Sequence, residues 1–207
     1  MRGPSDHVMP DVRIEPLKPE QTGEAAHLLA RAFVTNPLHA AAFGPSPIVA
    51  NEAFFRIGLA AMKGPTLVAV DGSRILGLIH WVHSPGCQLT GLGKLRIMPK
   101  MVKGLGVASA LKVSVWLSAW ARHDPGDGHV HLGPIGVEPE AQGRHIGHRL
   151  MDRYCEELDR TRTAGYLETD RLENVGFYKR SGFEVVETAP VLGVVNYFMR
   201  RHRAFPR

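Results

Sequence analysis

The segment Gln142-Gly143-Arg144-His145-Ile146-Gly147 lies between a strand-like run and an amphipathic helix, and the rest of the chain is organised around it. The run from residue 130 to 137 has the apolar content of a strand. After the segment, one apolar stripe recurs at every fourth position, through Ile146, Leu150, Tyr154 and Leu158. A loop that ends a strand and opens a helix leaves the first backbone N–H groups of the helix unpaired. The sequence therefore predicts a site that attracts phosphate.

Strands and helices alternate on both sides of this segment. Before it, the sequence predicts strands at 12–15, 66–70, 74–82 and 129–137 and helices at 20–33, 48–62 and 105–123, with 84–106 irregular. Asp71-Gly72-Ser73 is a strong hairpin signal, because a primed turn needs positive φ. After it, we predict helices at 146–161 and 172–181 and strands at 166–169, 183–187 and 194–200. This order indicates an α/β protein with a mixed sheet.

The loop resembles the acetyl-coenzyme A loop of the Gcn5-related N-acetyltransferase (GNAT) superfamily, Gln/Arg-x-x-Gly-x-Gly/Ala. Gln142, Gly143 and Gly147 carry the match, whereas His145 stands where the family has its first conserved glycine. If that position needs positive φ, histidine is among the non-glycine residues that tolerate it.

A second match follows at the distance of one helix and one strand. The run from Asn174 to Phe183 resembles the family segment that contains an asparagine, a tyrosine and a Gly-Phe pair. The resemblance implies that Asn174 contacts the pantetheine arm and that the Tyr178 hydroxyl approaches the thioester sulfur, where it acts as general acid. The alternative is that Tyr178 is a core aromatic residue without a catalytic role.

The resemblance implies a GNAT fold of the α/β (α+β) class. It has a mixed, mostly antiparallel sheet, flanked by helices, with a V-shaped splay between the fourth and fifth strands. The pantetheine arm would lie in this gap, held by the backbone of Ile135, Gly136 and Val137. Pro134 independently indicates an edge or a bulge, because proline has no ladder donor. A kinked strand without a ligand is the alternative.

The resemblance implies that the cofactor is acetyl-coenzyme A, bound as a co-substrate. Arg144, His148 and Arg149 would add positive charge near its pyrophosphate. The candidate histidines could instead be solvated, and metal ligation by His145, His148 and His129 or His131 lacks a fixed motif. We therefore expect no metal. The candidate cofactor-binding residues are Ile135, Gly136, Val137, Gln142, Gly143, Arg144, His145, Ile146, Gly147, His148, Asn174 and Phe177.

Glu168 ends a predicted strand and is the candidate base. The stretch from Leu167 to Phe183, together with Trp81, resembles the puromycin N-acetyltransferase branch of the family. By that resemblance, Glu168 takes a proton from a substrate amine or binds its charge. Tyr178 is the other catalytic residue and acts as the general acid. A surface carboxylate with no role is the alternative.

Composition indicates one ordinary globular domain. The 207 residues are 44% hydrophobic and carry a formal net charge of +5, and the dense basic cluster lies at the C-terminus. We expect a leader at 1–10, a single N-acetyltransferase domain at 11–200 and a basic tail at 201–207. No DNA-reading motif, apolar leader or membrane-length run is present, and the two cysteines do not form a disulfide framework. We therefore expect a cytoplasmic protein with no nucleic-acid or membrane partner.

The resemblance predicts an enzyme that transfers acetyl directly from acetyl-coenzyme A to a primary amine, most simply that of a small molecule. The acceptor would be chosen by the helices around Phe33 to Phe55, the stretch from Ser84 to Gly106 and the strand near Tyr197. One alternative is a protein N-terminal or lysine acetyltransferase. Another is a non-catalytic acyl-coenzyme A sensor, an alternative that remains because His145 replaces the usual loop glycine. A monomer and a homodimer are both compatible with the sequence.

Overall fold

The computed structural model describes residues 12–87 and 90–203. Within them, seven strands form one sheet in the order β1-β2-β3-β4-β5-β7-β6. All neighbours are antiparallel except β4 and β5, which are parallel. The strands are β1 (Arg13–Pro16), β2 (Thr66–Asp71), β3 (Arg74–His83), β4 (His129–Val137), β5 (Ala164–Thr169), β6 (Glu184–Val191) and β7 (Val194–Arg201).

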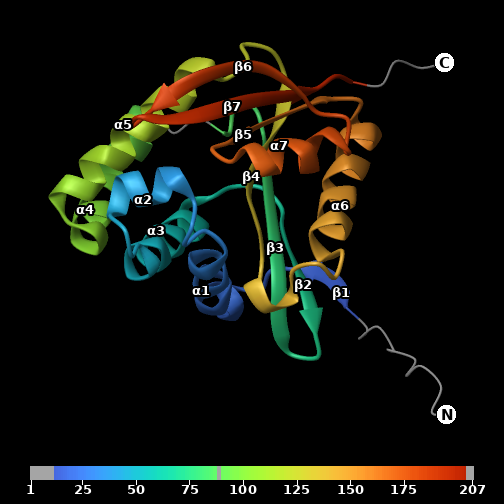
Figure 1. Ribbon diagram of the computed structural model, residues 1–207, viewed down its shortest axis with the longest axis horizontal. Helices are drawn as coiled ribbons and strands as arrows, with labels where there is room; N and C mark the ends of the chain where they lie inside the picture. Colours follow the sequence, from blue (N-terminus) through green and yellow to red (C-terminus); the bar gives the residue numbers. More distant parts are fainter. Residues whose placement is uncertain (1–11, 88–89, 204–207) are drawn as a thin grey trace.

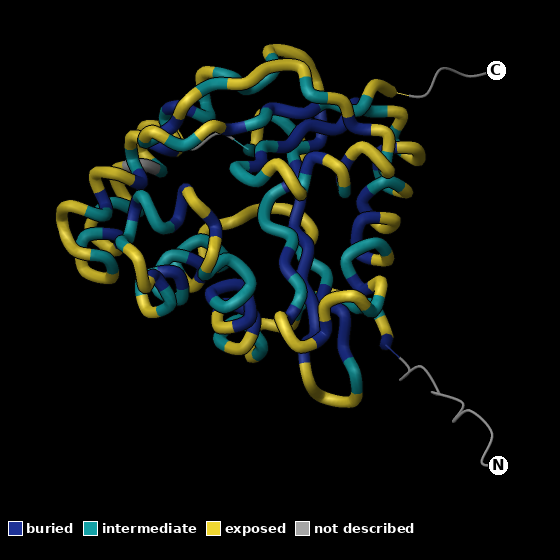
Figure 2. The backbone as a smooth tube through the Cα atoms, viewed as in Figure 1, coloured by how far each residue is buried: buried dark blue, intermediate teal, exposed yellow. Residues whose placement is uncertain are grey.

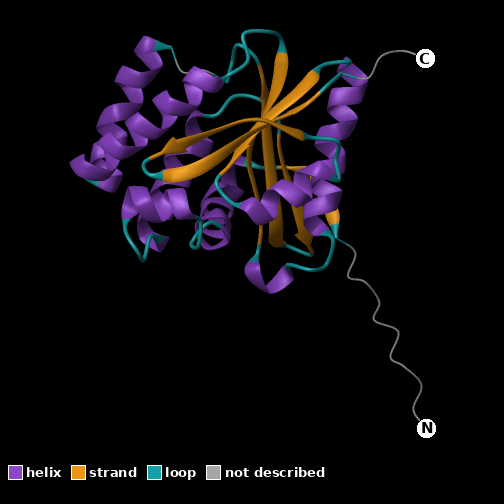
Figure 3. Cartoon of the chain, turned by 45° about the horizontal axis from the view of Figure 1, so that its top comes forward, coloured by secondary structure: helices purple, strands orange, loops and turns teal. Residues whose placement is uncertain are grey.

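Helices cover both faces of the sheet (Figure 1). They are α1 (Thr22–Ala32), α2 (Pro37–Phe43), α3 (Ile48–Ala61), α4 (Gly91–Leu105), α5 (Val107–His123), α6 (Ile146–Thr161) and α7 (Leu172–Lys179), with short 3-10 turns η1 (Pro19–Gln21) and η2 (Pro139–Ala141). Helix α6 packs on β2, β3 and β4, and α1 packs on β3 and β4 from the other face. Helices α1 to α5 gather on one side of the molecule and α6 lies on the other (Figure 3).

Three apolar clusters hold these layers together, and the central strands are mostly buried (Figure 2). One cluster lies between the sheet, α6 and α7, and includes Leu150, Tyr154 and Phe183. A second joins α1 and α3 to β2 and β3. The third joins α2, α4 and α5 around Trp116. The helices on the α1 side therefore have a core of their own, beside the sheet.

Strands β4 and β5 pair over a short length only. The pairing joins His129, Val130 and His131 to residues 164–166, and the rest of β4 pairs with β3 alone. The register of β3 and β4 shifts where Gly133 and Pro134 face His80, and a Cβ atom at Gly133 would lie 2.8 Å from the His80 ring. The bulge predicted from Pro134 is therefore confirmed, and so is the mixed, mostly antiparallel sheet with its divergence between the fourth and fifth strands.

Two helices were missed in the sequence. No helix was predicted between residues 33 and 48, but α2 begins at Pro37, where a missing N–H is harmless. Its next N–H, that of Leu38, donates to the carboxylate of Asp170 at 2.8 Å, a contact distant in the sequence. The stretch 84–106 was expected to be irregular, but α4 occupies its second half. Thr90 caps α4 by accepting from Gly93 N at 3.1 Å.

The predicted domain limits stay a prediction. The leader 1–10 lies outside the described residues, as does the end of the predicted basic tail. Strand β7 continues to Arg201, one residue past the expected domain limit, and β6 extends to Val191 rather than residue 187. Among the helices in the described part of the chain, none is long and apolar enough to cross a membrane.

Candidate active site

The loop before α6 presents the start of that helix without a side-chain cap. Gly143 has φ of 80° and His145, the N-cap residue, has φ of 58° in the left-handed region. No side chain accepts a hydrogen bond at this N-cap among the described residues. The first N–H groups of α6 are therefore available to an anion. The Gln142 side chain folds back and donates to the Val137 carbonyl at 3.3 Å.

His145 adopts the left-handed conformation that is ordinarily favourable only for glycine. A left-handed L residue costs roughly 1–2 kcal/mol, and a glycine there would lose about 0.5–1 kcal/mol of chain entropy relative to alanine. We expect His145→Gly to raise the free energy of unfolding by about 0.5 kcal/mol and to retain binding of acetyl-coenzyme A. Chemical denaturation and calorimetric titration would measure both quantities.

A matched control lies at the other end of α6. Arg162, its C-cap residue, also has positive φ, of 51°. Arg162→Gly should stabilise the fold similarly without touching the cofactor loop. A fall in cofactor affinity for His145→Gly alone, at unchanged stability, would show that the imidazole binds the ligand and that its backbone conformation is secondary.

Positive side chains near the loop divide into two groups. Arg144 is partly buried, and its Nη2 atom has no hydrogen-bond partner within the described residues. His148 packs edge-on against Phe177, with ring centroids 5.0 Å apart, and His145 lies 5.7 Å from His148. Arg149 differs from the expectation, because its guanidinium donates to the Val12 carbonyl at 2.6 Å. Arg149 therefore ties the start of the sheet to α6.

A cavity of about 1460 Å³ opens where β4 and β5 diverge. The backbone of Ile135, Gly136 and Val137 lines it, together with most of the 142–148 loop. On the α1 side, the backbone at Gly136 lies close to Leu29, since a Cβ atom at Gly136 would lie 2.8 Å from Leu29 Cδ2. The cavity therefore joins the strand gap, the helix start and the helices α1 to α5 in one space.

Tyr178 lies at the edge of this cavity. Its side chain is 6% exposed, packs beside Phe177 and Phe183, and lines the cavity together with Asn174. Burial, and to a smaller extent the Asp170 carboxylate, raises the pKa of Tyr178 above its ordinary value of 10, so the phenol keeps its proton. Asn174 Nδ2 donates to Thr169 Oγ1 at 3.4 Å. The structure thus brings both motifs of the sequence to one cavity.

Glu168 is buried and is not a surface carboxylate, and its role in the reaction stays a prediction. Its side chain is 2% exposed, and Oε2 accepts a hydrogen bond from His131 Nε2 at 2.8 Å. Burial opposes charge on His131, but the carboxylates of Glu168 and Asp124 outweigh burial and raise its pKa well above 6.5. The other oxygen, Oε1, is buried without a hydrogen-bond partner among the described residues. Glu168 therefore binds His131 through one oxygen and also borders the cavity.

Two of the three regions expected to choose the acceptor line the cavity, and their role stays a prediction. Phe33 and Phe55 line it from α1 and α3, and α4 and α5 contribute Met101, Trp116 and Trp120. Tyr197, in contrast, lies beside a separate recess of about 310 Å³. The part of the cavity next to α1, α3, α4 and α5 therefore contains several aromatic side chains.

The sequence did not identify the cluster formed by Cys87, Asp124, His129 and His131. The two histidines alternate on one strand, but Cys87 and Asp124 come from loops, and no fixed spacing links the four. His145 and His148 do not join His129 and His131 in any such cluster of the described residues.

Residues 112–185 match the family model described as an acetyltransferase (GNAT) domain. That range contains the loop, β5 and Tyr178. The chain has the GNAT fold. Residues 112–185 are thus similar to an acetyltransferase domain, and solved structures with the same fold are N-acetyltransferases by name.

Three solved structures illustrate the likeness. The histone acetyltransferase HPA2 and related acetyltransferase of Corynebacterium glutamicum has a TM-score of 0.71 at 21% identity, covering 94% of this chain and 98% of that one. Arylalkylamine N-acetyltransferase 2 of Aedes aegypti gives 0.66 at 12%, covering 93% and 99%. A GNAT acetyltransferase of Brucella melitensis in complex with acetyl-CoA gives 0.51 at 18%, covering 96% and 93%.

Proposed function

We propose that this protein is an acetyl-coenzyme A-dependent N-acetyltransferase that transfers acetyl directly to the primary amine of a small molecule. The observation that carries the proposal is the single cavity that joins the divergent strands, the uncapped start of α6 and the Tyr178 side chain. A neighbour of the same fold was solved with acetyl-CoA, which supports the choice of co-substrate.

The residues present fit acetyl-coenzyme A. The N–H groups at Ile146, Gly147 and His148 offer donors to a pyrophosphate, and Arg144 adds charge beside them. The backbone of residues 135–137 lacks a strand partner on the β5 side and lines the cavity, so it can bind the pantetheine amides. Asn174 and Phe177 line the same space nearer Tyr178.

The chemistry requires that a neutral amine attack the thioester carbonyl while the sulfur departs with a proton. Tyr178 supplies that proton in our proposal, since burial keeps its hydroxyl protonated. Glu168 is the proposed base or charge-binding group, acting through its unpartnered Oε1 atom. Held together in one cavity, the reactants gain from proximity as well as from acid–base catalysis.

The acceptor has an apolar body in this proposal. The helices on the α1 side line the cavity with Phe33, Phe54 and Trp116, a surface that favours an aromatic or alkyl group beside the amine. The neighbour named arylalkylamine N-acetyltransferase supports such an acceptor. The finer assignment to the puromycin N-acetyltransferase branch rests on Trp81 and residues 167–183 and is part of the same proposal.

A thiol-release assay with acetyl-coenzyme A and a panel of amines tests the function. The panel should contain arylalkylamines, linear polyamines, aminonucleosides and a lysine peptide at equal concentrations. Turnover of an apolar amine with the highest kcat/KM supports the proposal. Preference for the peptide would favour a protein acetyltransferase, and tight cofactor binding without turnover of any amine would favour the sensor.

A further inference from the structure

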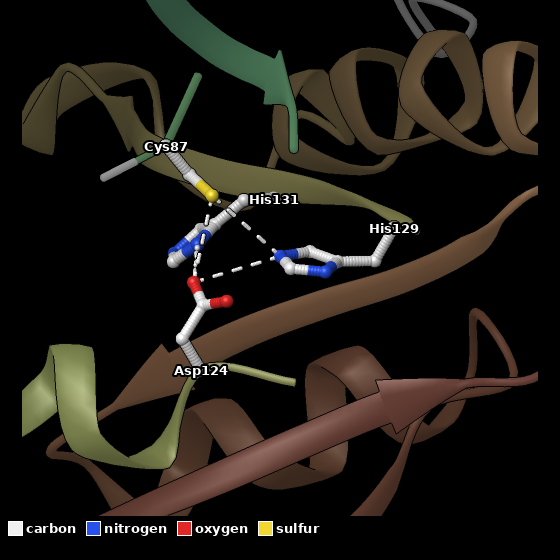
Figure 4. A group of neighbouring side chains, drawn as sticks. All are labelled: Cys87, Asp124, His129 and His131. Atoms are coloured by element: carbon white, nitrogen blue, oxygen red, sulfur yellow. Dashed lines mark hydrogen bonds and ion pairs between the residues drawn. The ribbon is translucent and has the colours of Figure 1, made fainter. Parts of the chain in front are cut away.

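Four side chains with metal-binding atoms converge beside the joint between β4 and β5 (Figure 4). Cys87 follows β3, Asp124 follows α5, and His129 and His131 alternate at the start of β4. One atom from each lies within 4.8 Å of the atoms from the other three. Three chain segments that are remote in sequence thus present sulfur, oxygen and nitrogen to one point.

Four of the six distances between these atoms match those of a zinc tetrahedron. Asp124 Oδ2 lies 3.5 Å from Cys87 Sγ and 3.6 Å from both His129 Nε2 and His131 Nδ1. Cys87 Sγ lies 3.7 Å from His129 Nε2. Zinc–ligand distances of about 2.0–2.3 Å place neighbouring ligand atoms of a tetrahedron about 3.3–3.8 Å apart. These four distances therefore fit a zinc site, and the other two, from His131 Nδ1 to Cys87 Sγ and to His129 Nε2, are within 4.8 Å.

The outer nitrogen of each imidazole is already held. His129 Nδ1 lies 2.9 Å from the Asp127 carbonyl, which only accepts, so this nitrogen carries the hydrogen. His131 Nε2 donates to the Glu168 carboxylate at 2.8 Å. With the outer hydrogens in place, a metal ion that displaces any inner proton meets the lone pairs of His129 Nε2 and His131 Nδ1. Such carbonyl–histidine and carboxylate–histidine pairs are typical of zinc ligands.

The cluster needs positive charge at its centre. The His129 side chain is fully buried, and those of Asp124 and His131 are 12% and 15% exposed. His131 Nδ1 is buried without a hydrogen-bond partner among the described residues, since 3.6 Å from Asp124 is too long for one. A proton on His131 supplies this charge without metal, in keeping with its raised pKa, and a divalent cation supplies it when it replaces that proton.

We propose that Cys87, Asp124, His129 and His131 bind one Zn²⁺ ion in a tetrahedral site. A thiolate with two imidazoles is a poor donor set for Ca²⁺ or Mg²⁺ and suits zinc. With four protein ligands the site is closed, so its role is structural. It ties the end of β3, the end of α5 and β4 together where β4 and β5 part. Glu168 is a positioning residue, because it orients His131.

Cobalt substitution of the full-length protein tests the proposal directly. After removal of metal with a chelator, titration with Co²⁺ should give tetrahedral ligand-field bands and a thiolate charge-transfer band, saturating at about one ion per chain. Zinc should abolish both bands. A spectrum of octahedral cobalt without a thiolate band would overturn the proposal, and so would fewer than about 0.1 tightly bound zinc ions per chain.

The chain provides a matched control in its second cysteine. Cys155, on α6, is similarly half-buried and outside the cluster. Cys87→Ala should lower zinc affinity at least about 100-fold, while Cys155→Ala leaves it unchanged. Zinc should also protect Cys87 from alkylation in the parent protein but not Cys155, a measurement that needs no folded variant. Equal protection of both cysteines, or full zinc affinity in a folded Cys87→Ala variant, would contradict the assignment.

Discussion

Replacing Tyr178 by phenylalanine is expected to lower kcat about 10²- to 10⁴-fold, the usual contribution of a general acid. The ring packs beside Phe177 and Phe183, so the substitution keeps the apolar contacts and removes the hydroxyl alone. The KM for acetyl-coenzyme A should change little, because the expected cofactor contacts are mostly backbone groups. Steady-state kinetics by thiol release would measure both constants.

Tyr197→Phe is the matched control for this experiment. Tyr197 lies beside the separate recess and does not line the large cavity, so the substitution should leave kcat unchanged. A parallel fall in both variants would indicate a general effect on the fold. Unchanged kcat in Tyr178→Phe, with the protein folded and cofactor bound, would remove the tyrosine from the mechanism and favour water as the proton donor.

Stability is expected to fall steeply between pH 6.5 and pH 4. Burial lowers the pKa of His39 and of His80 from 6.5 to about 4. Within this interval the unfolded chain takes up two protons that the folded chain refuses, so acid favours unfolding. Each histidine contributes up to about 3 kcal/mol above pH 6.5 that is lost by pH 4. Chemical denaturation at successive pH values, in chelator, measures the slope.

The reason for these low pKa values lies in the packing. His39 is surrounded by aromatic rings of α3 and α5 and hydrogen-bonds Asn51 at 2.9 Å, with Asp170 offsetting burial only in part. His39→Leu should roughly halve the slope of stability against pH, whatever its effect on stability itself. His27→Leu is the control, since the His27 side chain is 52% exposed. An unchanged slope in His39→Leu would contradict the assignment.

Local patterns were sufficient for most of the fold. The hairpin through Asp71-Gly72-Ser73 and the apolar stripe of α6 are both features of short segments, and both are present. Helix α2 was missed because part of its stabilisation comes from Asp170, far along the chain. Helix α4 was missed because glycine and Pro99 mask its periodicity, which becomes visible only when its apolar side meets α3 and α5.

Some features of the candidate site could likewise be predicted from short segments of sequence, and others could not. The loop pattern gave positive φ at His145 only as a condition, and the backbone meets that condition. The roles of Tyr178 and Glu168 stay predictions, although both side chains border the cavity. The cluster at Cys87 was beyond sequence reasoning, because its ligands come from three elements and meet only when β4 is placed between β3 and β5.

The short pairing of β4 with β5 has a mechanical consequence. Three consecutive rungs, from His129 to His131, connect the amino-terminal half of the sheet to β5, β7 and β6. If the angle between β4 and β5 changes, each residue of β4 moves in proportion to its distance from these three paired residues. Val137, at the unpaired end of β4, therefore moves farther than His131. Fixing the three paired residues in place fixes the width of the gap between the two strands along its whole length.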